Sequence, residues 1–517
     1  MGRPSRQLTH AADRARVFRK TGRTKAIAAA LALLLLATGC SAGSSASVSP
    51  GPDTLSVGIT AEPSSFDFTS SDGAAIPQAL LYNVYEGLVK LDPQGRVVPL
   101  LAKSWTISPD RRTYDFRLQP GVRFANGAPF TAEDVKFSLM RVKTDWTISL
   151  KSAMDVVDHV DAVAPDHARV VLSKPSNGWL FSLTGRVGAM FSPTGVADLA
   201  NHPVGTGPYE IASRRRGDSI VLKENPRYWG RKPAYRTVVL KYYTDPTALN
   251  NALLSNSIDV ISALTSADSI PQFQGDDRFT VLQGTTNSEV TLAFNNRRAP
   301  LNDVRVRQAL SYAIDRKAVL DLVFNGRGTL IGSMVPPTDP WYEDLSKAYS
   351  YDPAKAKQLL AEAGVHDLQL RLRIPNLPYA VSAAQVVQSQ LADVGVRTTI
   401  EPLDFPAVWL KQVFTDHDYD LSIIQHVEAR DITTFGKPTY YWGYDGKRVQ
   451  QLLASADSGT PQQQVTDMKQ VARQLSADAA ADWLFLFPNV IVAKKKVTGF
   501  VRNQVSESFD LTGVRPA

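Results

Sequence analysis

The stretch Pro300–Val335, PLNDVRVRQALSYAIDRKAVLDLVFNGRGTLIGSMV, decides how this chain folds. Its first half predicts a helix that Asn302 or Asp303 can cap, because either side chain accepts backbone N–H groups that lack partners at a helix start. Asp315 can cap a second helix, which ends before Asn325-Gly326. Apolar residues of the first helix recur on one face, and three polar residues fall off it. The apolar residues are Val306, Ala309, Leu310, Ala313 and Ile314, and the polar ones are Arg305, Arg307 and Gln308.

Strands and helices are predicted on both sides of this stretch. Thr54–Thr60 alternates apolar and polar residues, as a half-buried strand does. Leu368–Ile374 alternates in the same way, and a helix over Ser382–Asp393 and a strand over Val396–Pro402 complete a βαβ unit. Trp483–Phe487 is apolar on both faces, which predicts a buried strand.

Separated motifs along the chain resemble a single family. The stretch Pro300–Val335 is similar to the core signature of the ABC-importer solute-binding proteins for dipeptides, oligopeptides and nickel. These proteins are called extracellular solute-binding protein family 5. The resemblance covers most of residues 54–500. The further motifs are Tyr85–Val89, Pro99–Trp105, Ser108–Asp110, Thr113–Gly121, Gly205–Tyr209, Asn225–Gly230 and Tyr351–Leu360.

This resemblance implies an α/β, two-lobed periplasmic-binding-protein-like fold of class II type with an inserted extra domain. Domain I would comprise residues 54–92, 205–286 and 498–517. The inserted domain II would comprise residues 93–204, and domain III residues 287–497. Two crossover segments, near Thr285–Val290 and Ala493–Val501, would form the hinge.

The basic charge of the chain is concentrated at its start. The formal net charge is +7, but residues 1–39 hold eight basic residues and one acidic residue. The rest of the chain has 49 basic and 49 acidic residues, so its formal net charge is zero. A balanced charge gives no support for nucleic-acid binding. The length of 517 residues predicts two or more domains.

The single cysteine, Cys40, follows an apolar run, Ala26–Ala37. This run is shorter than the roughly 20 residues that span a bilayer and is typical of a secretory signal. Ala37–Cys40 resembles a lipobox, with Ala37 where Leu, Val or Ile is usual. We expect residues 1–39 to be a lipoprotein signal peptide, Cys40 to be lipidated and residues 40–53 to form a flexible tether. Cleavage without lipidation is the alternative.

Sequence templates for enzymes are missing. The chain has no His-Glu-x-x-His, no Gly-x-Ser-x-Gly and no P-loop motif. Its seven histidines are scattered, with no pair at metal-ligand spacing, and one cysteine allows no thiolate cluster. We therefore expect no catalytic residues, no enzyme activity, no cofactor and no bound metal.

A candidate ligand loop follows the strand that ends near Ile423. Capture of a peptide needs a carboxylate for the ligand ammonium group. In peptide-binding members of the family, a Trp lies three residues before the acidic anchor for this amine, and an acidic-Pro pair follows. The resemblance puts Glu428 at the anchor, Gln425 at the Trp position and Asp431 at the acidic-Pro position. Arg430 adds a cation, and a plain surface ion pair between Glu428 and Arg430 is the alternative.

Four aromatic residues lie within Thr439–Tyr444. They could stack against a ligand as a wall of its site, or they could form a local core beneath the loop. The candidate ligand contacts in this segment are Tyr441, Trp442 and Tyr444. His426 could touch a ligand or a metal, although a lone histidine is more often structural. Two further candidates, Glu62 and Ser64, match a family segment that runs beside the ligand backbone.

The resemblance implies a lipid-anchored protein on the outer face of the cytoplasmic membrane, in the cell envelope or periplasm. It would capture dipeptides or oligopeptides by hinge closure between two lobes and deliver them to an ABC permease with its ATPase subunits. We expect a monomer that binds no nucleic acid. The departures at Gln425 and Asp431 keep a second interpretation open, in which the solute is a nickel chelate, haem or another non-peptide.

Overall fold

The computed structural model describes residues 51–71 and 73–517. The predicted signal peptide, Cys40 and most of the predicted tether lie outside the described residues. Pro52–Ala517 forms one compact unit. None of the helices in this part of the chain has both the length and the apolar character needed to cross a bilayer.

The described residues form one large mixed sheet with ten strands. β1 pairs in parallel with β10 and β11, β13 pairs in parallel with β14 and β15, and β12 runs antiparallel to both β15 and β16. In spatial order the strands are β14 (Arg397–Leu403), β13 (Gln369–Pro375), β15 (Leu421–His426), β12 (Phe279–Phe294), β16 (Ala481–Lys494), β11 (Val260–Ile261), β1 (Thr54–Ile59), β10 (Thr237–Tyr242), β9 (Ser219–Glu224) and β8 (Tyr209–Arg215).

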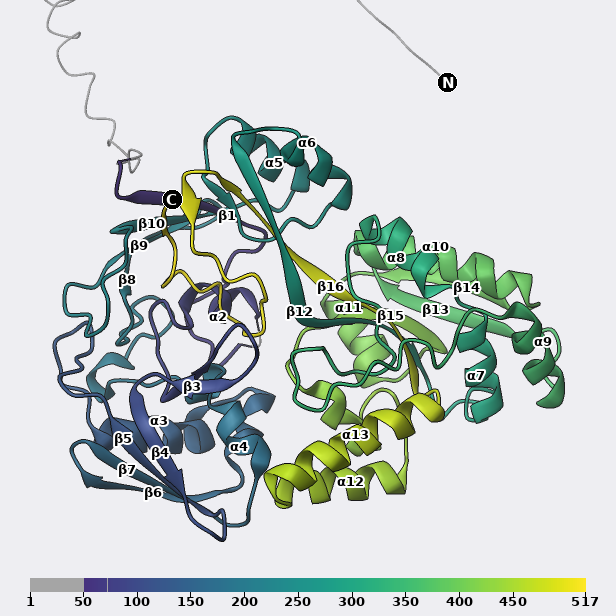
Figure 1. The fold of residues 1–517 in the computed structure, drawn as a ribbon, viewed down its shortest axis with the longest axis horizontal. Coiled ribbons are helices and arrows are strands. Elements are labelled where there is room, and N and C mark those ends of the chain that lie inside the picture. The colour runs from purple at the N-terminus through teal and green to yellow at the C-terminus, as the bar shows by residue number, and fades with distance from the viewer. Residues whose placement is uncertain (1–50, 72) are drawn as a thin grey trace, which may run out of the picture. The chain divides into compact units, whose positions relative to one another are not determined.

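Two long strands, β12 and β16, join the two sides of this sheet (Figure 1). Their pairing is regular from Phe279 to Thr285, where Thr285 lies opposite Pro488. The register then shifts, and pairing resumes at Glu289 opposite Leu486. A break of this kind interrupts the ladder and bends the strand. It falls within the first segment expected as a hinge and opposite the middle of β16.

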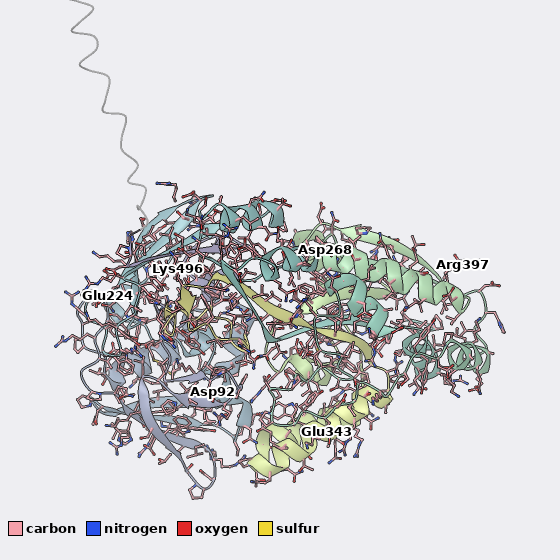
Figure 2. The ribbon with its side chains drawn as sticks, turned by 45° about the horizontal axis from the view of Figure 1, so that its top comes forward. Asp92, Glu224, Asp268, Glu343, Arg397 and Lys496 are labelled. Atoms are coloured by element: carbon pink, nitrogen blue, oxygen red, sulfur yellow. The ribbon has the colours of Figure 1, made fainter. Side chains whose placement is uncertain are left out.

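A second sheet belongs to residues between β1 and β8. Its four strands are β4 (Ala102–Ile107), β5 (Thr113–Leu118), β7 (His167–Leu172) and β6 (Val157–Ala164). Short two-stranded ladders are formed by β2 (Val89–Leu91) with β3 (Val97–Pro99) and by β17 (Val497–Thr498) with β18 (Arg515–Pro516). Figure 2 shows Glu224 and Lys496 in the lobe that contains these elements, and Arg397 at the far end of the other lobe.

The α-helices of the described residues cover these sheets. They are α2 (Ala75–Leu80), α3 (Ala132–Asp145), α4 (Asn177–Ser182), α5 (Pro246–Leu254), α6 (Ile270–Gln274), α7 (Val304–Tyr312), α8 (Arg316–Phe324), α9 (Pro353–Glu362), α10 (Pro378–Asp393), α11 (Ala407–Trp409), α12 (Lys447–Ser458) and α13 (Pro461–Ala477). The 3₁₀ helices are η1 (Ser149–Met154), η2 (Arg186–Gly188), η3 (Pro193–Gly195), η4 (Ala267–Ser269) and η6 (Asp431–Gly436), and η5 (Leu410–Thr415) is a π-helical turn.

The two helices predicted within Pro300–Val335 are confirmed as α7 and α8. Asp303 caps α7 by accepting from the Arg305 backbone N–H at 2.9 Å, which decides between the two predicted caps. Asp315 caps α8 by accepting from the backbone N–H of Ala318 at 3.1 Å. Asn325 ends α8 in the left-handed conformation, with φ of 50°. The predicted apolar face of α7 is buried.

The prediction that Arg307 falls off the buried face was wrong. Its guanidinium is buried and donates to the backbone carbonyls of Leu301 at 2.8 Å, Asp478 at 2.7 Å and Ala479 at 3.0 Å. These carbonyls lie where chain segments end or turn, so they have no ladder partner of their own. Arginine suits such a position because its donors fan out from one planar group.

Several element limits differ from their predictions. The predicted βαβ unit is confirmed, but α10 begins at Pro378 rather than Ser382 because proline is accepted in a first helical turn. The strand predicted over Trp483–Phe487 runs from Ala481 to Lys494. Long strands that span two cores have no periodicity to mark their limits.

Candidate functional site

The site is built at the end of β15, where it pairs with β12. Glu289 and His426 lie directly opposite each other in this antiparallel pair. Directly opposed residues carry their side chains on the same face of a sheet. Both side chains are buried, so an ionisable pair lies in the interior of the sheet.

The loop after β15 turns back over this pair. Arg430 adopts the left-handed backbone conformation with φ of 62°, which bulky residues rarely adopt, and η6 begins at the next residue. The turn carries Asp431 to His426, where His426 Nδ1 lies 3.3 Å from Asp431 Oδ2. On its other side His426 Nε2 is 2.8 Å from the Tyr441 hydroxyl, and the two rings are stacked at 14°.

Arg430 is held between two aromatic rings. Its Cζ lies 3.4 Å from the centroid of the Phe181 ring and 4.6 Å from that of Trp341. Its Nε is 3.6 Å from Asp339 Oδ1, which is ion-pair distance but too long for a hydrogen bond. Phe181 belongs to α4, in the part of the chain expected as domain II, so Arg430 joins segments of both expected lobes.

Three carboxyl groups are buried beside this arginine. Burial, and then the nearby negative charge of Asp431, raise the pKa of Glu289 well above its usual range. Burial raises the pKa of Asp431 and of Asp339 to about 6, although His426 opposes the shift at Asp431 and Arg430 opposes it at Asp339. Within the described residues, no hydrogen-bond partner reaches Glu289 Oε2 or Asp431 Oδ1, and Asp431 Oδ2 has only His426 Nδ1 beside it, at 3.3 Å. Such groups are costly to bury unless a cation accompanies them.

Glu428, an exposed residue of the same loop, is the last member of a cluster of ionisable residues. The other members are Glu289, Asp339, His426 and Asp431. One potential ligand atom from each of His426, Glu428 and Asp431 lies within 4.8 Å of the others. This spacing of two and three residues matched no metal-binding motif in the sequence, and only the turn at Arg430 brings the groups together. The arrangement can accept an ammonium group, and its nitrogen and carboxylate donors also suit a divalent transition metal.

The aromatic segment packs beneath the loop. Tyr441 and Trp442 are buried, with ring centroids 4.2 Å apart, and the Trp442 indole N–H donates to Thr434 at 3.1 Å. Tyr444 points elsewhere, because its hydroxyl donates to Asp478 at 2.6 Å. Of the two interpretations, a wall that stacks against a ligand and a local core beneath the loop, this packing matches the local core. Tyr441 still contacts the site through His426.

The remaining predicted site residues are engaged with other partners. Glu62 accepts from the Arg214 guanidinium at 3.2 Å and from the Gly217 backbone N–H at 3.0 Å, near the β8–β9 turn. The carbonyl of Ser64 accepts from the same guanidinium at 3.1 Å. The backbone N–H of Gln425 donates to the Tyr379 hydroxyl at 2.9 Å. The alternative interpretation, a surface ion pair of Glu428 with Arg430, is not what the described residues form, because Arg430 pairs with Asp339.

Sequence reasoning missed Glu289, Asp339, Phe181 and Trp341. Only Glu289 carried a signal, since it is the one acidic residue of β12 and directly precedes the largely apolar end of that strand, Val290–Phe294. The other three come from segments far away along the chain, and no local pattern marks them.

Comparison with known proteins gives consistent results. The sequence matches the family described as "Bacterial extracellular solute-binding proteins, family 5 Middle" over residues 96–450. It is 30% identical over 420 residues to Di/tripeptide-binding protein 2 of Pseudomonas aeruginosa, covering 75% of this chain and 78% of that protein. It is 28% identical over 359 residues to the nickel-binding periplasmic protein of Escherichia coli, covering 64% and 67% respectively.

The fold is similar to that of solved solute-binding proteins. The crystal structure of the ABC transporter substrate-binding protein CtaP from Listeria monocytogenes matches with a TM-score of 0.80 at 22% identity, covering 90% of this chain and 99% of that one. The predicted two-lobed α/β fold of the periplasmic-binding type is therefore confirmed.

Proposed function

Because the chain belongs to the bacterial extracellular solute-binding proteins of family 5, as its motifs predicted, we propose that it captures peptides for an ABC importer. The solute would be a dipeptide or oligopeptide, bound as the two lobes close and then delivered to the permease. The Di/tripeptide-binding protein of Pseudomonas aeruginosa supports this ligand class.

The observation that carries the proposal is the convergence of Glu428, Asp431 and His426 at the end of β15. Glu428 is exposed and can meet the ammonium group of an incoming peptide, while Asp431 lies buried behind it. A charge-assisted hydrogen bond between ammonium and carboxylate is strong where water is excluded. Arg430 between Phe181 and Trp341 would then mark the closed state, since it needs both lobes.

The proposed motion is a hinge at the register break of β12. Residues 287–497 would move as domain III against domain I (54–92, 205–286 and 498–517), which carries domain II (93–204). The break between Thr285 and Glu289 supports this hinge, because the pairing of β12 with β16 is interrupted there.

Anchoring to the outer face of the cytoplasmic membrane through a lipidated Cys40 remains a proposal from the sequence. Growth with an alkyne-labelled fatty acid should label the full chain but not a Cys40→Ser variant. A chain that is secreted and cleaved yet carries no label would leave simple signal cleavage as the explanation.

Native mass spectrometry tests the ligand class. The full chain, purified from cells without a refolding step, is measured intact and then denatured to release what it carried. We expect a ladder of short peptides, whose lengths would define the capacity of the site. A single non-peptide mass would overturn the proposal.

The metal-like geometry of His426, Glu428 and Asp431 favours one second candidate, a metal chelate such as a nickel complex, or haem. The nickel-binding relative from Escherichia coli supports this class. Elemental analysis together with an absorbance spectrum of the purified protein separates the two candidates. Stoichiometric metal or a haem band would favour the second, and neither would be expected for a peptide binder.

A further inference from the structure

The charges of the site do not balance around a single ligand amine. Glu289, Asp339, Glu428 and Asp431 contribute four carboxyl groups, and Arg430 is the nearby guanidinium. Arg430 is already paired with Asp339 and shielded by two aromatic rings. Three carboxyl groups therefore remain, and among the described residues the ion pair that they form is that of Asp431 with the His426 imidazole.

Glu289 is the group that the proposed peptide capture leaves unused. Its side chain is only 2% exposed, and within the described part of the chain its Oε2 has no hydrogen-bond partner. It projects from β12 on the same face as His426, directly opposite in the ladder, and therefore into the cluster. Asp431, Asp339 and Glu428 all act on it as neighbouring negative charges.

A buried carboxyl group among other carboxyl groups has two ways to avoid an unpaired charge. It can stay protonated and serve only the structure, or it can meet a second cation when the ligand binds. Placement at the hinge end of β12, beside the proposed amine anchor, makes the second role available each time the lobes close.

We infer that the site selects peptides whose first residue carries a cationic side chain, such as lysine, ornithine or arginine. This inference rests on the proposed peptide function. Glu428 and Asp431 take the terminal ammonium, and Glu289 takes the second positive charge. The doubly charged end of the ligand then matches the excess of carboxyl groups.

Calorimetric titration of the full chain with three tripeptides tests the inference. Lys-Ala-Ala carries the second charge, norleucine-Ala-Ala has nearly the same shape without it, and Ala-Ala-Ala lacks the long side chain. We expect Lys-Ala-Ala to bind about tenfold more tightly, or more, than norleucine-Ala-Ala, as for a buried charge-assisted hydrogen bond. Equal affinities for these two peptides would overturn the inference and leave the proposed function standing.

Glu289→Gln provides the matching variant. It should remove most of the lysine preference and leave the affinity for norleucine-Ala-Ala within about twofold, since only the charge partner is lost. Glu86→Gln is the control, because Glu86 is a fully buried carboxyl group outside the site. A lysine preference that survives in Glu289→Gln would overturn the role of Glu289.

The wild-type comparison needs no variant, so it stands even if Glu289→Gln does not fold. No binding of any of the three peptides, with a folded protein by circular dichroism, would count against the proposed peptide function itself. The inference would then fall with it.

Discussion

Asp457 in α12 and Gly178 in α4 are joined by a hydrogen bond in which the Gly178 backbone N–H donates to Asp457 Oδ1 across 3.0 Å. Ser176 Oγ donates to the same oxygen at 2.8 Å. No side chain of α4 caps its own start, so Asp457 supplies this acceptor from another part of the chain. Asn177 Nδ2 donates in return to the Gly459 carbonyl at 2.8 Å, and Figure 1 shows α4 beside α12.

The Asp457→Ala variant should therefore weaken the proposed closed state. The expected result is a three- to tenfold faster release of bound peptide, because about 1 kcal/mol of interlobe hydrogen bonding is lost at a partly exposed position. Stopped-flow displacement of a labelled peptide measures this rate.

Asp445→Ala is the control for the same helix, since Asp445 bonds to Gln450 within the α12 segment and not to α4. Its release rate should equal that of the wild type. An unchanged rate in Asp457→Ala would mean that the bond between α4 and α12 persists whether or not ligand is bound.

The Glu428→Ala variant should lose affinity for peptides by about tenfold or more, because the proposed anchor for the ligand ammonium is removed. Calorimetric titration with a peptide recovered from the purified protein checks this expectation. Glu224→Gln is a suitable control, because Glu224 pairs with Lys232 in the other lobe (Figure 2). Unchanged affinity in Glu428→Ala would transfer the anchor role to Asp431.

The local parts of this fold could be predicted from the sequence. Asp303, Asp315 and Asp352 cap helices through backbone groups two or three residues ahead. Thr131 and Asp134 form a capping box that opens α3. The donor and the acceptor of each interaction lie within one helical turn, so the local sequence specifies the interaction.

The candidate site could be predicted only in part, because it is assembled from distant segments. The loop with Glu428 was placed by its resemblance to a family, but its partners were not. Asp339 lies about 90 residues before Arg430, and Phe181 about 250 residues before it. Such contacts depend on how the lobes pack, for which a single sequence has no periodic signal.

The Glu86→Gln variant should change how stability depends on pH. Glu86 is fully buried and accepts hydrogen bonds from Trp229 at 2.9 Å, Thr206 at 2.8 Å and Tyr228 at 3.2 Å. Burial is the main cause that raises its pKa to about 7, against the three hydrogen bonds. The folded state therefore favours the protonated form, and the free energy of unfolding falls as pH rises from about 4.5 through 7.

The free energy of unfolding that is lost through Glu86 amounts to about 3 kcal/mol at most, from a shift of roughly 2.5 pKa units. Glutamine resembles the protonated carboxyl group, so the variant should lack this part of the pH dependence and gain stability relative to wild type at pH 8. Urea unfolding at pH 5 and pH 8 measures both. Parallel pH profiles for the two proteins would contradict the raised pKa of Glu86.

The Arg307→Ala variant should destabilise the protein by about 3 kcal/mol or more, because three buried carbonyl groups lose their donor. Arg305→Ala on the same helix is the matched control. Arg305 is exposed and pairs with Asp303 at 2.6 Å, so its loss should cost about 1 kcal/mol or less. Urea unfolding at one pH compares the two variants directly. Equal losses would mean that the apolar face of α7 alone holds the helix in place, and that the carbonyls of Asp478 and Ala479 find water when the guanidinium is gone.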